Sequence, residues 1–222
     1  MSTSEQHFDE IAKEYDYWKS KNWYYYQNLK ALYRSFIPLQ SKVWEIGCGT
    51  GDILAYLEPS DGYGTDISQE MINIANKKHG NNPNLKYGAL DIIKLNEIKN
   101  YEYIFMADVL EHVEDLNGFF AALKRITKPG VKIIISVANP LWEPVLMLSE
   151  KLGMKMPEGP HWRLSIKQNE EIFRKNGFKI KEKGYRLLIP KKLPGSDWVN
   201  IRFSKIPVLS KMGFVIYWVL LK

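Results

Sequence analysis

The sequence predicts a doubly wound α/β fold, in which a largely parallel sheet is covered by helices on both faces. From residue 42 onward, short apolar segments typical of strands alternate with helical segments over more than 100 residues, which favours a parallel sheet. Residues 131–138, VKIIISVA, are rich in β-branched side chains and apolar on both faces, as a central parallel strand should be. A glycine-rich turn directly follows the first expected strand, where such folds bind their ligands.

The expected elements follow in order along the chain. Apolar side chains recur at three-to-four spacing over residues 8–36, with no Gly or Pro, and predict a helix. Two final strands, 179–189 and 213–222, flank a Pro-containing segment without a clear helix. Between these ends we expect strands at 42–46, 62–67, 84–90, 101–110 and 131–138, and helices at 51–57, 69–78, 116–127 and 169–178.

Composition and length are those of one soluble globular domain with a small appendage. The 222 residues are 45% hydrophobic and 25% charged. The single cysteine excludes an internal disulfide, the N-terminus lacks the layout of a secretory signal, and the longest apolar run, 214–221, is shorter than a membrane helix requires. We therefore expect a cytoplasmic protein. Residues 151–222 carry 16 Lys or Arg and 5 Asp or Glu, a net charge of +11, which indicates either an acidic partner or a solvated basic face.

The turn VWEIGCGTGD at 43–52 has the glycines of a nucleotide-binding loop but the wrong charge for phosphate. Gly47 and Gly49 fit the G-x-G-x-x-G pattern, whereas Asp52 takes the place of its third glycine. Glu45 places a second carboxylate where a pyrophosphate would bind. The ligand of this loop is therefore expected to carry little negative charge.

Carboxylates end the first three expected strands. Glu45, Asp66 and Asp91 suit a ligand that donates hydrogen bonds through hydroxyls and amines. Asp66 is placed to accept from a ribose diol, Asp91 from an adenine amine, and the backbone N–H of Ile92 is offered to the adenine ring. Glu45 and the Gly47 carbonyl face the position of an ammonium. S-adenosylmethionine has these groups and no phosphate, so we predict it as the cofactor.

The run VWEIGCGTGD … YGTDIS … GALDI … YIFMADVLEHV … KPGVKIIIS resembles class I S-adenosylmethionine-dependent methyltransferases of the small-molecule type, over about residues 42–137. The resemblance implies a Rossmann-like, seven-stranded sheet in the order 3-2-1-4-5-7-6 with strand 7 antiparallel, and S-adenosylhomocysteine as product. It places Met71 on the adenine face and Ala107 at the methionyl end, although Met71 also suits the core and Cys48 suits a small filler. The cofactor-binding residues implied together are Glu45, Gly47, Cys48, Gly49, Asp66, Ile67, Met71, Asp91, Ile92 and Ala107.

The segment ADVLEHV, 107–113, is the candidate source of a catalytic base. In a helical turn, Asp108, Glu111 and His112 would share one face, and His112 would act as general base. These residues also resemble the E-x-x-E-H metal motif of quinone-pathway O-methyltransferases. Asp108 replaces its first Glu, which weakens that reading, and we expect no metal. A purely structural turn is the third reading.

Acceptor recognition is expected outside the cofactor pattern. Residues 139–165 follow the fifth strand as a substrate-facing insertion containing His161, Trp162 and Arg163, of which Arg163 suits a carboxylate or phosphate. A surface helix packed on the sheet is the alternative for its Met and Leu residues. Residues 1–40 are expected to form a helical cap or lid, with Tyr17 toward the acceptor, over a cofactor-binding domain of residues 41–222.

Together these observations predict a methyltransferase acting on a small or amphiphilic acceptor, with oxygen favoured over nitrogen. A non-catalytic cofactor-binding partner protein is one alternative. Methylation of lipid at a membrane surface is another, because Lys191, Lys192 and residues 205–222 mix cations with aromatics. Nucleic acid is disfavoured as a partner, since the Asp/Asn-Pro-Pro-aromatic turn of amino-methylating DNA enzymes is missing after the fourth strand. The oligomeric state is left open.

Overall fold

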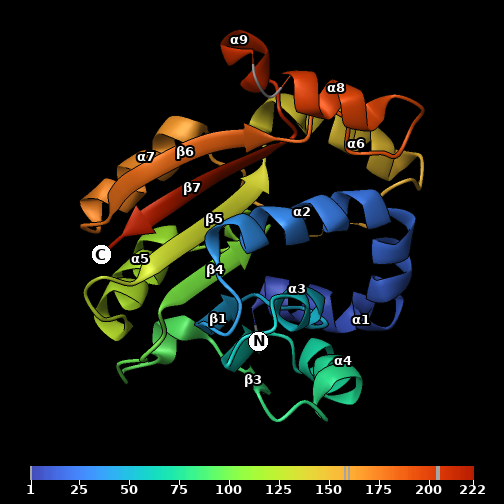
Figure 1. Ribbon diagram of the computed structural model, residues 1–222. Coiled ribbons are helices and arrows are strands. Elements are labelled where there is room, and N and C mark those ends of the chain that lie inside the picture. The colour runs from blue at the N-terminus through green and yellow to red at the C-terminus, as the bar shows by residue number, and fades with distance from the viewer. Residues whose placement is uncertain (1, 158, 160, 204–205) are drawn as a thin grey trace.

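The described residues form one seven-stranded sheet in the order β3-β2-β1-β4-β5-β7-β6 (Figure 1). The computed structural model describes residues 2–157, 159, 161–203 and 206–222. All neighbouring strands pair in parallel except β7, which is antiparallel to both β5 and β6. This arrangement confirms the predicted fold. The strands are β1 (Lys42–Ile46), β2 (Asp61–Asp66), β3 (Leu85–Ala89), β4 (Tyr103–Ala107), β5 (Lys132–Ala138), β6 (Lys179–Arg186) and β7 (Val215–Leu221).

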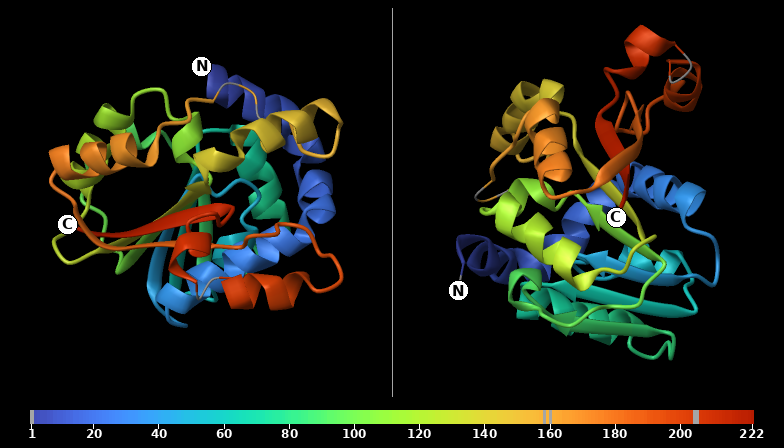
Figure 2. Two further views of the ribbon diagram at one scale, coloured as in Figure 1. Left: turned by 90° about the horizontal axis from the view of Figure 1, so that it is seen from above. Right: turned by 90° about the vertical axis from the view of Figure 1, so that its left-hand side faces the viewer.

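Helices cover both faces of the sheet because successive strand side chains point to opposite sides. On β1, Val43 belongs to the core beneath α2 and α3, whereas Trp44 belongs to the core beneath α5 and α7. The right-hand view of Figure 2 shows α5 and α7 on one side of the sheet and α2 on the other. The helices are α1 (Thr3–Lys21), α2 (Trp23–Phe36), α3 (Asp52–Tyr56), α4 (Gln69–His79), α5 (Leu116–Ile126), α6 (Glu143–Lys151), α7 (Ile166–Lys175), α8 (Ser196–Phe203) and α9 (Pro207–Ser210), with short 3-10 helices η1 (Ile92–Lys94), η2 (Leu110–His112) and η3 (Pro140–Trp142).

The expected helix over residues 8–36 is two helices that meet at Asn22. The Asn22 amide side chain donates to the Trp18 carbonyl at 3.1 Å, and its backbone N–H donates to the same carbonyl at 3.2 Å. Asparagine competes with helical hydrogen bonding in this way. The chain turns here without a Gly or Pro, and α1 then contacts α4 whereas α2 contacts α3.

The segment between the last two strands was expected to lack a clear helix but contains α8 and α9. The prolines of this segment favoured an irregular chain in the prediction. Helix α8 nevertheless begins directly after the turn at Gly195, where φ is +81°. The side chain of Asn200 within α8 exchanges hydrogen bonds with the backbone N–H and carbonyl of Ile189, at 2.8 and 3.1 Å. A contact between residues 11 positions apart leaves no local pattern in the sequence.

Candidate functional site

A cavity of about 710 Å³ lies at the carboxyl ends of β1, β2 and β4, below α1 and α2. This volume is within the range of small-molecule sites, and the position is where doubly wound sheets bind ligands. The structure brings every predicted cofactor residue to its wall: Glu45, Gly47, Cys48, Gly49, Asp66, Ile67, Met71, Asp91, Ile92 and Ala107.

Asp66, at the end of β2, holds the glycine loop while facing the cavity. Its Oδ2 accepts from the backbone N–H of Gly49 at 2.8 Å, and its Oδ1 accepts from that of Ser68 at 3.0 Å. Burial raises the pKa of this carboxyl, while the backbone donors act in the opposite direction. A carboxylate has about four acceptor positions, so Asp66 keeps acceptor capacity for a ligand hydroxyl.

The loop glycines allow the turn after β4 and helix α1 to pack closely against the loop. Gly47 and Gly49 have φ of +73° and +50°, which side chains rarely adopt. A Cβ on Gly47 would lie 2.4 Å from a methyl carbon of Val109, and one on Gly49 would lie 3.2 Å from the ring of Tyr15. Any larger residue would fill the cradle between the turn after β4 and α1.

Glu45 combines a structural contact with its place on the cavity wall. The buried carboxylate accepts from the backbone N–H of Leu54 at 3.1 Å. That N–H lies in the first turn of α3, where helical donors lack a partner within the helix. Burial is the main cause that raises the pKa of Glu45. Its predicted contact with a ligand ammonium therefore stays a prediction, beside this capping role.

The predicted adenine end is formed by the turn after β3. Asp91 is half-buried and caps η1, its Oδ1 accepting from the N–H of Ile93 at 3.0 Å. Ile92 and Met71 are buried beside it, 3% and 1% exposed. Carboxylate and apolar walls of this kind suit a ring that carries an amine.

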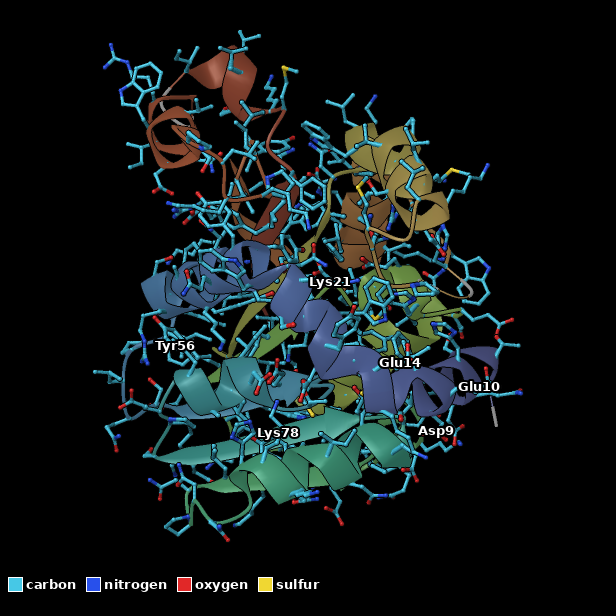
Figure 3. All side chains as sticks on the ribbon, turned by 90° about the vertical axis from the view of Figure 1, so that its right-hand side faces the viewer. Asp9, Glu10, Glu14, Lys21, Tyr56 and Lys78 are labelled. Atoms are coloured by element: carbon cyan, nitrogen blue, oxygen red, sulfur yellow. The ribbon has the colours of Figure 1, made fainter. Side chains whose placement is uncertain are left out.

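Helix α1 closes the cavity and is fastened at both ends. Asp9 accepts from the Ser68 hydroxyl at 2.6 Å, and Asp16 accepts from Lys78 at 2.8 Å. Lys19 pairs with Asp52 in the first turn of α3, and Lys78 pairs with the same carboxylate at 2.7 Å. Figure 3 labels Asp9 and Lys78 where α1 runs beside α4.

The turn after β4 presents two buried carboxylates to the cavity. Asp108 has φ of +55°, a strained conformation for a residue other than Gly, and its Oδ2 accepts from the Tyr25 hydroxyl at 2.5 Å. Asp108 Oδ1 and Glu111 Oε2 are buried and accept no hydrogen bond from the described residues. Burial raises the pKa of both carboxyls, and the charge of Asp108 raises that of Glu111 further. Strain and missing partners at one position indicate a site built for a ligand.

His112 also lines the cavity, on the 3-10 helix η2 instead of the α-helical turn that was expected. Its ring packs edge-on against Phe8 of α1, with centroids 5.0 Å apart, and its carbonyl accepts from the Ser4 hydroxyl at 2.9 Å. Helix α1 therefore contacts the candidate base directly. In the described part of the chain, no group of three His, Cys, Asp or Glu side chains is arranged to hold a metal ion.

The part of the cavity beyond the cofactor residues is mainly apolar. Burial lowers the pKa of Lys155, on this wall, to about 8. Sequence reasoning did not single out Lys155, Trp142 or Phe214, because these residues lie on separate segments and share no motif. The apolar lining here comes from Leu29, Ala138, Trp142, Val145, Leu146, Met154, Met156 and Phe214.

The four predicted acceptor-binding residues lie away from this lining among the described residues. Tyr17 is 56% exposed on the outer side of α1. Arg163 pairs with Glu143 at the start of α6, and His161 Nε2 lies 3.4 Å from the same carboxylate. The backbone N–H of Trp162 donates to the Glu111 carbonyl at 2.6 Å. These three residues thus connect α6 to η2 and support the cavity wall from behind.

A family model described as a methyltransferase domain matches residues 17–183, well over half of the chain. The chain belongs to the class I S-adenosylmethionine-dependent methyltransferases. This confirms the resemblance and the predicted cofactor.

Curated relatives of this methyltransferase differ in their acceptors. It is 29% identical over 177 residues to malonyl-[acyl-carrier protein] O-methyltransferase 1 of Ilyobacter polytropus, covering 77% of this chain and 65% of that protein. It is 25% identical over 162 residues to phosphoethanolamine N-methyltransferase 2 of Caenorhabditis elegans, covering 69% and 36%. The methyltransferase therefore matches less than two thirds of the length of either relative.

Solved structures share the fold at low sequence identity. An S-adenosylmethionine-dependent methyltransferase from Thermotoga maritima has a TM-score of 0.71 at 20% identity, covering 99% of both chains. Magnesium protoporphyrin IX methyltransferase from Synechocystis, with bound S-adenosylhomocysteine, has a TM-score of 0.57 at 18% identity, covering 98% and 86%. Of the helices in the described ranges, none is both long and apolar enough to cross a membrane.

Proposed function

We propose that the methyltransferase transfers the methyl group of S-adenosylmethionine to a hydroxyl oxygen of a small or amphiphilic acceptor. The observation that carries this proposal is the pair Asp108 and Glu111, two buried carboxylates on the cavity wall with oxygens that accept nothing from the described residues. A hydroxyl must lose its proton as it is methylated, and a carboxylate whose pKa is raised is a stronger base than usual.

The residues of the first three strand ends fit the cofactor. Gly47 and Gly49 lack side chains on the cavity wall and let Val109 and Tyr15 pack closely against the loop, and Asp66 retains acceptor capacity. Asp91 offers a second carboxylate, and neither contact requires a phosphate on the ligand. Bound there, the cofactor would supply an activated methyl group for direct displacement. The chain then has to align the acceptor and remove its proton.

In this proposal the turn after β4 does both. Ala107, the last residue of β4, is the predicted contact for the methionyl end of the cofactor. Asp108 follows it directly, and both residues line the cavity. The acceptor hydroxyl would pass its proton to Asp108 or Glu111, and from there to solvent, while its oxygen takes the methyl group; the methyl–sulfur bond would break in the same step and leave S-adenosylhomocysteine. His112 is the alternative base, because it lines the same cavity.

The acceptor's body is inferred from the rest of the lining. Trp142, Leu146 and Phe214 present apolar surface, whereas Lys155 and Lys191 present cations. Such a wall favours a molecule with an apolar part and an acidic or polar group. In this proposal, residues 1–40 act as the lid and residues 139–165 contribute the acceptor wall through α6.

An amine acceptor is the second candidate. Two buried carboxylates can pair with an ammonium, and the rings of Tyr15, Trp18, Tyr25 and Tyr26 on the same cavity can face it. A matched panel distinguishes the two candidates: one apolar scaffold carrying a hydroxyl, an amine or an already methylated oxygen. We expect labelled methyl transfer to the hydroxyl compound only. Transfer to the amine alone would overturn the assignment to oxygen.

Variants tie the activity to the site. Glu111→Gln and Asp108→Asn should each lower kcat by roughly a hundredfold while leaving cofactor affinity nearly unchanged. Glu97→Gln, on an exposed loop residue outside the cavity, is the matched control and should keep full activity. Equal activity in all three variants would remove the carboxylates from the mechanism.

A further inference from the structure

Exposed apolar side chains gather around the mouth of the cavity. Helix α6, the segment 187–195, α8 and α9 together form what we call the docking surface. Figures 1 and 3 show α6, α8 and α9 at the same end of the molecule. The indole N–H of Trp142 donates to the Met212 carbonyl at 2.8 Å, which joins the base of α6 to the chain after α9. The exposed apolar residues here are Leu141, Val145, Met147, Leu148, Leu152, Met154, Leu193, Trp198, Ile201, Ile206, Val208 and Met212.

Helix α8 exposes large apolar side chains to solvent, with Trp198 66% and Ile201 62% exposed. Two of its polar side chains are held by α2 instead: Asp197 accepts from the Tyr24 hydroxyl at 2.7 Å, and Asn200 donates to the same hydroxyl at 3.0 Å. A soluble surface helix usually turns its apolar side chains toward the core, and an exposed apolar patch of this kind marks an interaction site.

The described residues of the docking surface carry an excess of positive charge. Residues 187–203 and 206–212 contain Lys191, Lys192, Arg202 and Lys211 against Asp197, a net charge of +3. Helix α6 adds Lys151 against Glu143 and Glu150, which leaves a net charge of +2. Cations mixed with exposed Trp, Ile and Val side chains match the boundary between anionic headgroups and acyl chains.

The docking surface is continuous with the cavity. Val145 and Ser149 of α6 line the cavity from one side, and Pro190 and Lys191 line it from the segment that leads to α8. A molecule that enters between these elements therefore passes the exposed apolar rim first. The mouth of the cavity would therefore face any partner that the docking surface binds.

We infer that the docking surface binds an anionic lipid membrane peripherally and holds the cavity mouth against it, so that an amphiphilic acceptor enters from the lipid. The entry of the acceptor rests on the proposed function, whereas the membrane contact does not. The apolar side chains insert at the level of the headgroups, and the basic side chains pair with anionic lipid. No helix has to cross the bilayer for this contact.

Co-sedimentation with vesicles tests the inference on the full chain without an acceptor. We expect binding to phosphatidylcholine vesicles that contain phosphatidylglycerol, weakening as salt rises, and little binding to phosphatidylcholine alone. Trp198→Ser with Val208→Ser should weaken binding at least ~10-fold. Arg202→Gln with Lys211→Gln keeps every apolar contact and should weaken it by about 25-fold, or roughly fivefold per cation.

The matched control carries Leu39→Ser and Ile98→Ser, two exposed apolar residues that precede β1 and β4 at the opposite edge of the sheet. It should bind vesicles like the wild type. Absence of wild-type binding to anionic vesicles at low salt would overturn the inference. Vesicle binding by both docking-surface variants equal to that of the wild type would also overturn it. Cofactor titration and methyl transfer to a water-soluble acceptor, measured in parallel, report on the proposed function alone. Loss of vesicle binding with intact transfer therefore separates the two failures.

Discussion

The hydroxyl of Tyr25 donates a 2.5 Å hydrogen bond to Asp108 and joins α2 to the turn after β4. The carboxylate that follows the central strand is thereby held in a strained conformation, with its other oxygen directed to a buried position that accepts nothing from the described residues. This single contact links the lid to the proposed base.

Replacement of Tyr25 by Phe should change the pH profile of catalysis. Burial raises the pKa of Asp108, and the Tyr25 hydroxyl partly offsets this rise. Loss of the hydroxyl should raise the pKa further, so the acidic limb of kcat moves to higher pH and kcat at neutral pH falls roughly tenfold. Tyr24→Phe, which removes a hydroxyl bound to Asp197 on α8, is the control. An unmoved acidic limb would show that Asp108 is not the titrating base.

Replacement of His112 by Ala tests the base predicted from the sequence. If His112 takes the acceptor proton, kcat should fall by about a hundredfold, with much less change in the dissociation constant of S-adenosylmethionine. Steady-state kinetics and calorimetric titration give the two quantities separately. Turnover equal to that of the wild type would reject the role and leave the two carboxylates as the candidates.

Asp66 should control cofactor affinity. Asp66→Ala removes an acceptor for the ligand and the anchor of Gly49, and we expect a loss of ~1–3 kcal/mol in binding of both S-adenosylmethionine and S-adenosylhomocysteine. Calorimetry is the measurement, and Asp61→Ala at the other end of β2 is the control. Wild-type affinity in Asp66→Ala would place the ribose elsewhere.

Asp52 should make stability depend on acidic pH. Burial acts to raise its pKa, but Lys19 and Lys78 outweigh burial and bring the pKa well below its usual value. A group with a lowered folded pKa stabilises the fold above its unfolded pKa, near 3.8, and loses this effect as pH falls further. Asp52→Asn should therefore lower the free energy of unfolding by about 1 kcal/mol at neutral pH. Denaturant unfolding should show the difference vanishing in strong acid, whereas Glu97→Gln should show none at any pH.

Cys48 should report occupancy of the cavity. Burial raises the pKa of this single thiol, so a disulfide reagent should react at least ~100-fold more slowly than with a free thiol. Because Cys48 lines the cavity, S-adenosylhomocysteine should slow the reaction further. The unfolded chain, as control, should react fully. A fast native reaction would contradict the packing of the glycine loop.

The fold and the cofactor could be predicted from local sequence patterns. The strand pattern of residues 42–138 predicts the parallel sheet because burial on both faces requires continuous apolar runs, a property that each segment carries locally. Glu45, Asp66 and Asp91 lie at one edge because each is within two residues of the carboxyl end of a strand, and the carboxyl ends of parallel strands meet at one edge.

The surroundings of the proposed acceptor are set by the packing of elements that are distant in sequence. Asp108 meets Tyr25 across 83 positions in sequence, and Lys19 meets Asp52 across 33. Such pairs form because α1 and α2 fold back over the sheet. The direction of α2 relative to α1 depends on the break between the two helices at Asn22. His161, Trp162 and Arg163 stand in a suggestive cluster, yet the structure turns them toward Glu143 and η2. Local patterns report which face is buried, whereas the partners in a cavity are chosen by the packing of distant elements.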